Sequence, residues 1–183
     1  QEGMENCKKT AQAAARALDI DENAVLVAST GVIGQQLPVD KICDGVEALA
    51  PLLSDSREAG TMAAQAIMTT DTVKKECAVE LTLGGKTVVI GGMCKGSGMI
   101  HPNMCTMLSF ITTDAAISKE LLQKAMSSTV ADSYNMVSVD GDTSTNDTAL
   151  VLASGLAGNE KITKEDEDYA AFVEALAFVN QTL

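Results

Sequence analysis

The stretch Cys77-Ala-Val-Glu-Leu-Thr-Leu-Gly-Gly-Lys-Thr-Val-Val-Ile90 decides the fold. Its two halves are rich in the apolar and β-branched residues that are typical of strands. Gly84-Gly85 separates them, and paired glycines accept the positive φ angles that a two-residue hairpin turn requires. We therefore predict an antiparallel hairpin formed by residues 77–83 and 86–90.

Helices are predicted on both sides of this hairpin, because apolar residues recur there at helical spacing. Pro38 opens one of these helices, and Asp55 or Ser56 caps another. The predicted elements are helices near 4–18, 38–49, 56–68, 118–130 and 169–179, and strands near 24–29, 107–111, 134–139 and 149–153. Helices that precede and follow groups of strands favour a layered mixed α/β fold with a largely antiparallel sheet.

Composition excludes several classes of function. The 183 residues are 46% apolar and 21% charged, which is enough for one domain with a sizeable core. A net charge of −12 repels nucleic acid and anionic membrane surfaces. No apolar run approaches the ~20 residues that a membrane span needs. Five cysteines without a C-x-x-C pair, and a single histidine, favour free thiols in a reducing cytosol and argue against a metal site.

One segment combines backbone strain with a reactive side chain: Lys95-Gly-Ser-Gly-Met-Ile-His-Pro-Asn-Met-Cys-Thr-Met-Leu108. A loop of Gly and Pro can press the Thr106 hydroxyl onto the Cys105 carbonyl, so that an N-to-O acyl shift and hydrolysis cut the chain before Thr106. The freed amine, with an ordinary pKa of ~7.7–8.0, could then act as base for its own hydroxyl. A β-branched residue that simply begins a strand is the alternative.

The same segment resembles the self-cleavage segment of the ornithine acetyltransferase family, also called glutamate N-acetyltransferase. Further stretches match that family in order and approximate spacing: Ala28-Ser-Thr-Gly-Val-Ile-Gly34, Ala66-Ile-Met-Thr-Thr-Asp71 and Ser138-Val-Asp-Gly-Asp-Thr-Ser-Thr-Asn-Asp-Thr148. Together the motifs cover essentially the whole chain. The family is longer at both ends, so residues 1–183 are expected to be a single catalytic-core domain from the middle of a longer protein.

The resemblance implies a fold and an activity. The fold is an αββα sandwich with mixed, mostly antiparallel sheets, reminiscent of N-terminal-nucleophile hydrolases. The activity is acetyl transfer from N2-acetyl-L-ornithine to L-glutamate, by a ping-pong mechanism through an acetyl-threonine, in cytoplasmic arginine biosynthesis. No cofactor is implied, although acetyl-CoA serves some members as a co-substrate. Cleavage into 1–105 and 106–183 would give an α and a β chain that assemble as α2β2.

The resemblance also implies roles for individual residues. Thr106 is the nucleophile and a substrate contact, while Thr30 and Gly31 form the oxyanion hole through a hydroxyl and a backbone N–H. Thr69 and Lys95 contact the substrate, with Lys95 suited to a carboxylate. Without the resemblance, an ordinary turn at Ser29-Thr30-Gly31, a helix end at Thr69 and a solvated Lys95 would explain these residues better.

Two departures from the family pattern stand out. Cys105 occupies the position before the nucleophile, where the family commonly has Ala, and we interpret it as a passive leaving residue. The family's downstream substrate contacts lie beyond Leu183. Two other functions stay open: an amidase or aminopeptidase of related self-processing fold, which tends to use Ser at the cut, and a non-catalytic assembly domain. No role follows from the sequence for the loop at 140–148.

Overall fold

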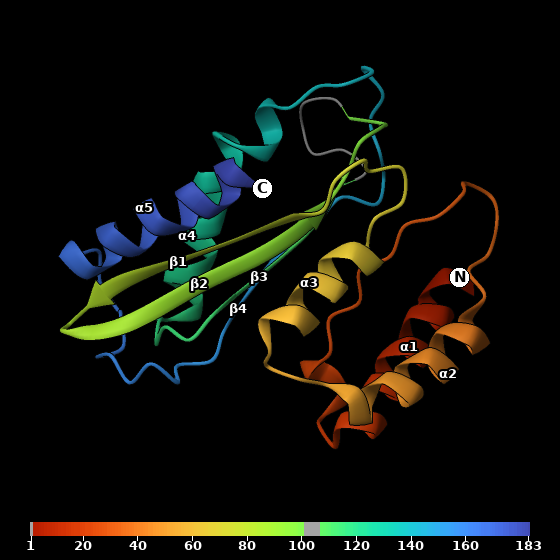
Figure 1. Ribbon diagram of the computed structural model, residues 1–183, viewed down its shortest axis with the longest axis horizontal. Helices are drawn as coiled ribbons and strands as arrows, with labels where there is room; N and C mark the ends of the chain where they lie inside the picture. The colour runs from red at the N-terminus through yellow and green to blue at the C-terminus, as the bar shows by residue number, and fades with distance from the viewer. Residues whose placement is uncertain (1, 101–106) are drawn as a thin grey trace. The chain divides into compact units, whose positions relative to one another are not determined.

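The computed structural model describes residues 2–100 and 107–183. The chain forms two compact units, Gln1–Gly60 and Thr61–Leu183, called unit 1 and unit 2 below, and each is described by itself (Figure 1). Cys105 and Thr106 lie outside the described residues. Among the described helices, none combines the length and apolarity needed to cross a membrane.

Unit 1 is helical. It holds α1 (Glu2–Leu18), α2 (Val39–Leu49), the short 3-10 helices η1 (Glu22–Ala24) and η2 (Ala50–Leu52), and the start of α3 (Arg57–Ala66). The helices predicted from apolar periodicity in this region are therefore confirmed. Of the two candidate caps for α3, Ser56 rather than Asp55 accepts the Ala59 N–H, at 3.2 Å. The strand predicted at 24–29 is wrong. That segment forms part of η1 and then an irregular stretch without ladder pairing, since no neighbouring strand is available in this unit.

Unit 2 is built on a four-stranded sheet in the order β1-β2-β3-β4. The strands are β1 (Lys75–Leu83), β2 (Lys86–Lys95), β3 (Leu108–Thr113) and β4 (Thr148–Ala153). The β1–β2 and β2–β3 pairings are antiparallel, whereas β3–β4 is parallel. The parallel pair is joined through α4 (Lys119–Ala131), as a crossover requires. The predicted mixed, mostly antiparallel α/β class is therefore confirmed.

The predicted hairpin is present, and its turn has the expected backbone. Gly84 and Gly85 have φ angles of 55° and 76°, as a primed two-residue turn demands. The turn is also held from outside, because the Gly84 N–H donates to Asp168 Oδ1 at 3.2 Å. Asp168 belongs to the first turn of α5 (Glu167–Thr182). Local turn chemistry and a long-range bond thus fix the same hairpin.

Strand β2 continues past the predicted end at Ile90 as far as Lys95. The glycines at 91 and 92 hid this extension from sequence reasoning. At Gly92, an added Cβ would approach the Ile111 side chain to 3.0 Å and the Phe110 carbonyl oxygen to 3.2 Å. Glycine is needed here for close packing rather than for a turn. The extension carries Lys95 to the end of the sheet.

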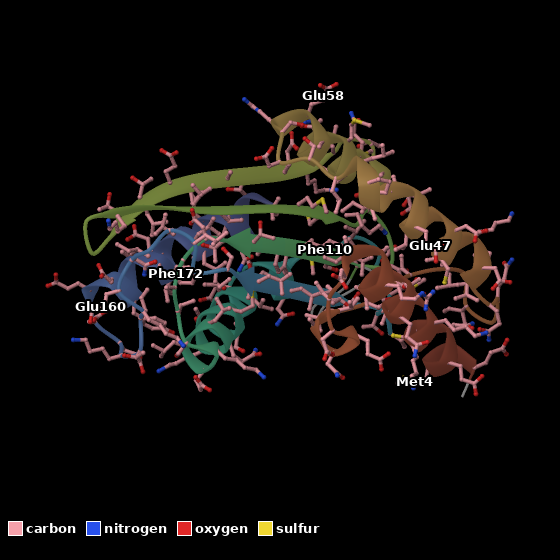
Figure 2. All side chains as sticks on the ribbon, turned by 90° about the horizontal axis from the view of Figure 1, so that it is seen from below. Met4, Glu47, Glu58, Phe110, Glu160 and Phe172 are labelled. Carbon is pink, nitrogen blue, oxygen red and sulfur yellow. The ribbon has the colours of Figure 1, made fainter. Side chains whose placement is uncertain are left out.

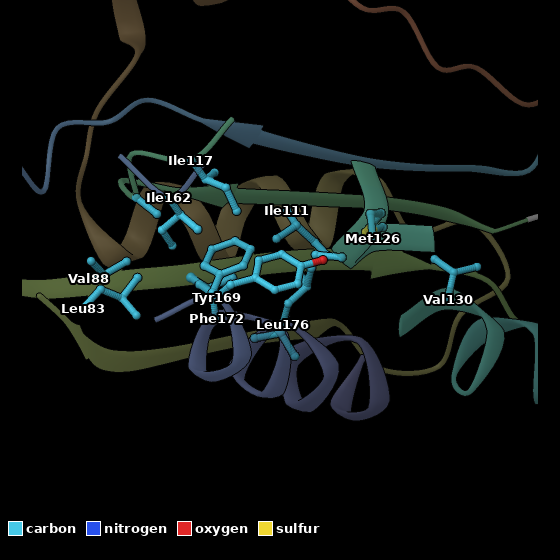
Figure 3. Close-up of a cluster of buried hydrophobic side chains, with 14 of the residues drawn as sticks. Leu83, Val88, Ile111, Ile117, Met126, Val130, Ile162, Tyr169, Phe172 and Leu176 are labelled. Atoms are coloured by element: carbon cyan, nitrogen blue, oxygen red, sulfur yellow. The ribbon is translucent and has the colours of Figure 1, made fainter. Parts of the chain in front are cut away.

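Helices α4 and α5 cover one face of the sheet and enclose the core of unit 2 (Figure 3). Phe172 and Leu176 of α5 are fully buried against Ile90 and Ile111 in the same hydrophobic cluster. Phe110, which neighbours Ile111 in β3, alternates to the opposite face; Phe110 and Phe172 are both labelled in Figure 2. Within the predicted sandwich, unit 2 thus supplies one sheet and its helix layer.

The strand predicted at 134–139 is also wrong, because Tyr134–Met136 forms a 3-10 helix, η3. The Tyr134 hydroxyl lies 2.8 Å from Ser109 Oγ and donates to Asn180 Oδ1 at 3.1 Å. Asn180 in turn donates to Thr129 Oγ1 at 2.8 Å. This buried polar network joins β3, α4 and α5. A partner for the tyrosine hydroxyl, rather than β propensity, decides the local backbone.

Candidate functional site

The residues that the sequence singled out fall into three groups. Lys95 and Thr69 lie in unit 2, Thr30 and Gly31 lie in unit 1, and the cleavage residues lie outside the described part of the chain. Each group is therefore described within its own unit.

Lys95 is the last residue of β2 and is only 3% exposed. It pairs directly with Leu108, the first residue of β3. Its neighbour Cys94 faces the helices, since the Cys94 thiol donates to the Leu183 carbonyl oxygen at the end of α5 at 3.2 Å. Alternation therefore turns Lys95 to the opposite face. Its ammonium has no hydrogen-bond or ion-pair partner among the described residues. The alternative of a solvated lysine is therefore wrong, and the substrate contact stays a prediction.

Asp71 ties the chain beside Thr69 to the chain beside Lys95. Its side chain is fully buried. It accepts the Thr69 N–H at 3.2 Å, the Gly96 N–H at 2.8 Å and the Lys75 ammonium at 2.6 Å. Lys75 also donates to the Gly96 carbonyl oxygen at 3.1 Å. Both backbone polar groups of Gly96 are thus held by one ion pair.

The pKa of Asp71 reports the strength of this arrangement. Burial by itself would raise that pKa. The hydrogen bonds from Lys75, Gly96 and Thr69, together with the charge of Lys75, outweigh burial and lower the pKa to about 2. The carboxylate is therefore charged at any physiological pH, and the ion pair with Lys75 is permanent.

A second contact joins the same two segments. The Thr70 hydroxyl lies 2.6 Å from Ser97 Oγ. Thr69 itself is exposed and lies in the short segment that follows α3. The structure thus brings the Thr69 and Lys95 segments together. Sequence reasoning missed Asp71 and Lys75, although Asp71 ends the Ala66–Asp71 stretch, since no pattern reveals which backbone amides a carboxylate will meet.

In unit 1, Thr30 and Gly31 precede a turn in which the Gln35 N–H donates to the Val32 carbonyl oxygen at 3.1 Å. Gly34 supplies the positive φ, 81°, within this turn. Gly31 is exposed, and a Cβ there would approach the Leu37 side chain to 3.1 Å. Thr30 and Gly31 thus lead into a turn that ends at Gly34, and Gly31 is exposed at its start.

A cavity of ≈ 360 Å³ lies in unit 2 at the end of the sheet that carries Lys95. Its lining includes Ile100 and Met107, which stand on either side of residues 101–106. It also includes Cys94 and Tyr134, which belong to the helix side of the sheet. Lys95, Lys75 and Gly96 line it as well, so the cavity borders the segment that the Asp71–Lys75 ion pair holds. Its position marks the end of the sheet where the candidate residues gather.

The loop that follows η3 contacts the chain on both sides of residues 101–106. Asp140 accepts the Met99 N–H at 2.5 Å and the Ile100 N–H at 2.8 Å. These bonds lower the Asp140 pKa. Asp147 accepts the Met107 N–H at 3.1 Å, and in the described part of the chain its other, buried oxygen has no hydrogen-bond partner. Burial raises the Asp147 pKa despite the bond to Met107.

The chain matches the family model described as the ArgJ family over residues 1–183. It is 51% identical over 183 residues to the arginine biosynthesis bifunctional protein ArgJ of Caldanaerobacter subterraneus subsp. tengcongensis, covering 100% of this chain and 45% of that protein. It is 54% identical over 179 residues to the arginine biosynthesis bifunctional protein ArgJ 1 of Clostridium acetobutylicum, covering 98% and 43%. The chain thus spans less than half the length of these relatives.

A solved structure is similar as well. The crystal structure of the arginine biosynthesis bifunctional protein argJ from Bacillus halodurans matches with a TM-score of 0.52 and 39% sequence identity. The match covers 59% of this chain and 54% of that one. It bears out the N-terminal-nucleophile type of fold predicted above. From the match along its whole length, the chain belongs to the ArgJ family.

Proposed function

We propose that this chain is the central part of a glutamate N-acetyltransferase, with Thr106 as a nucleophile that becomes an N-terminus by self-cleavage. The enzyme would move acetyl from N2-acetyl-L-ornithine to L-glutamate in arginine biosynthesis. Family membership supports this reading, and the names of the relatives place those proteins in arginine biosynthesis.

One observation carries the proposal: the two candidates described in unit 2, Thr69 and Lys95, lie on segments that meet where β2 ends and β3 begins. Lys95 pairs with Leu108, two residues after Thr106 in the chain. Asp71 ties the Thr69 segment to Gly96, directly after Lys95. A buried lysine without a described partner is a strong site for a carboxylate, because its charge is already removed from bulk water. Both proposed substrates carry a carboxylate.

The self-cleavage needs only groups of the chain. The Thr106 hydroxyl oxygen would bond to the Cys105 carbonyl carbon, the C–N bond would break, and the hydroxyl proton would pass to the Thr106 nitrogen. Water would then hydrolyse the ester, leaving a carboxylate on Cys105 and a free amine and hydroxyl on Thr106. An amine with a pKa of ~7.7–8.0 can take the hydroxyl proton near neutral pH.

Acetyl transfer would follow in two half-reactions. The Thr106 hydroxyl attacks the acetyl carbonyl of N2-acetylornithine, and the proton passes through the Thr106 amine to the departing ornithine amine. The glutamate amine then attacks the acetyl-threonine ester and restores the hydroxyl. Thr30 and Gly31 are the proposed oxyanion donors, and the exposed Gly31 leaves its backbone open to an acyl oxygen. Lys95 would hold the carboxylate and Thr69 would contact the substrate.

The rest of the proposal extends from the same chemistry. The two cleaved chains, 1–105 and 106–183 with their continuations, would assemble as α2β2. The enzyme would work in the cytoplasm, where its amino-acid substrates are made. No step above needs a cofactor, and acetyl-CoA would enter only as an alternative acetyl donor.

The test compares the protein, expressed from its gene as encoded, with Thr106→Ala and a matched control, Thr112→Ala. Thr112 is an exposed residue of β3. Intact-mass spectrometry under denaturing conditions should find wild type and Thr112→Ala split between Cys105 and Thr106, and Thr106→Ala whole. Acetyl transfer from N-acetylornithine to glutamate should fall by roughly 10³-fold or more in Thr106→Ala alone.

Four results would contradict the proposal. A wild-type chain that stays whole yet transfers acetyl would show that the activity does not need self-cleavage. Transfer by Thr106→Ala at the wild-type rate would remove the nucleophile. Release of acetate without glutamate acetylation would instead favour the amidase reading, and the absence of both cleavage and turnover would favour an assembly domain.

A further inference from the structure

The loop at 138–148 contacts the chain directly before and directly after residues 101–106. On the leading side, the Ile100 carbonyl oxygen accepts the Val139 N–H at 2.7 Å, and Asp140 accepts the two amides of Met99 and Ile100. On the trailing side, the Met107 N–H donates to Asp147, and the Met107 carbonyl oxygen accepts the Thr148 N–H at 3.0 Å. One short loop therefore fixes both flanks.

The leading flank is under backbone strain. Met99 has a φ of 58°, a left-handed conformation that is unfavourable for a non-glycine residue. Each carboxylate oxygen of Asp140 accepts one of these amides: one oxygen accepts the Met99 N–H and the other accepts the Ile100 N–H. A carboxylate that accepts two adjacent amides makes charge-assisted bonds, and these can hold such a conformation in place. Asp140 therefore opposes relaxation of the chain before the cut.

The trailing flank is held at a cost. Asp147 uses one oxygen for the Met107 amide and buries the other, which has no hydrogen-bond partner among the described residues. A buried acceptor that no described residue satisfies normally destabilises a protein, so this group calls for an explanation beyond stability. The Met107 amide belongs to the peptide bond that joins residues 106 and 107. Asp147 thus fixes the peptide next to the proposed nucleophile.

We propose that Asp140 and Asp147 are positioning residues for self-cleavage, which set the ends of the segment that contains the Cys105–Thr106 bond. The inference rests on the proposed function, because it assigns a role within that cleavage. An acyl shift requires the hydroxyl and the carbonyl carbon to stay in near-attack geometry. Anchoring both flanks removes backbone freedom that would otherwise have to be lost before the reaction.

The test measures the cleavage rate in cell-free translation, with a labelled pulse and denaturing electrophoresis of the folded fraction. The variants are Asp140→Ala and Asp147→Ala. Asp142→Ala is the matched control, because Asp142 lies in the same loop, is exposed, and contributes a backbone N–H rather than its carboxylate. Each of the first two should cleave about tenfold more slowly or worse, while the control keeps the wild-type rate.

The asparagine variants separate positioning from a general loss of structure. Asn at 147 keeps one amide oxygen for Met107, so Asp147→Asn should recover most of the rate. Asn at 140 keeps one acceptor where two amides need one each, so Asp140→Asn should recover less. Unequal recovery is expected because Asp140 accepts two amides and Asp147 accepts one, whereas a general loss of folding would not distinguish the two positions.

The outcomes distinguish the two proposals. If wild type is cut but Asp140→Ala and Asp147→Ala are cut as fast as Asp142→Ala, the positioning role is wrong and the proposed function stands. The positioning role is equally wrong if Asp147→Asn recovers nothing. If the wild-type chain is never cut, both proposals fall together.

Discussion

Replacing Asp71 with Asn isolates the charge of the buried ion pair, because Asn has nearly the same shape and no charge. The folded state lowers the Asp71 pKa from 3.8 to about 2. Each pKa unit corresponds to about 1.4 kcal/mol, so the charged form stabilises the fold by roughly 2 to 3 kcal/mol at neutral pH. Asp71→Asn should lose about that much and leave the Lys75 ammonium without its carboxylate.

Urea denaturation followed by circular dichroism suits a chain without tryptophan. Because the folded-state pKa lies below the unfolded one, the stabilisation is present above pH ~4 and disappears as the pH falls towards 2. The gap between wild type and Asp71→Asn should therefore shrink over that window. Lys124→Gln is the control, since it breaks an exposed pair with Glu165 and should leave the midpoint unchanged. A gap below ~0.5 kcal/mol at pH 7, or one that does not depend on pH, would refute the reasoning.

Two further predictions concern the core of unit 2. Phe172→Ala should cost about 3 to 5 kcal/mol in unfolding free energy, since Phe172 is fully buried, and a loss below 1 kcal/mol in urea melts would show that α5 packs elsewhere. Burial raises the pKa of the Cys94 thiol to about 11, so iodoacetamide at pH 8 should label Cys7 and Cys43 well before Cys94 in native protein; peptide mapping that finds Cys94 labelled first would contradict this burial.

The hairpin was predictable because its information is local. Gly84 and Gly85 fix the turn, and the residues on either side have strand composition, so neighbours in sequence are also partners in space. Most helices were predictable for the same reason. The helix predicted at 118–130 is α4, and Ser118 caps it by accepting the Leu121 N–H.

Two strand predictions were wrong because local composition favoured a strand, whereas the tertiary structure offered no strand partner or a better hydrogen bond elsewhere. Residues 24–29 have strand-like side chains but no strand beside them in unit 1. Tyr134 instead turns into a 3-10 helix, where its hydroxyl reaches Ser109 and Asn180. A strand is a property of a pair of segments, and one sequence segment does not state its partner.

The candidate site divides in the same way. The family motifs named Thr30, Gly31, Thr69, Lys95 and Thr106, and these roles stay predictions. Asp71 was quoted within a motif without a role, and the loop at 140–148 had none at all. Their roles depend on which backbone amides lie within reach of a carboxylate, and those amides come from segments ~25 and ~40 residues away.

The sequence alone determined the mixed α/β class, the hairpin and the family motif around Thr106. Only the tertiary structure decided that Lys95 is buried at a strand end, that Asp71 and Lys75 hold Gly96, and that Asp140 and Asp147 anchor the two flanks of residues 101–106. The physical reason is the sequence separation of the interacting groups. Turns and helices are set by residues a few positions apart, whereas a buried charge is stabilised by donors that the fold brings from distant parts of the sequence.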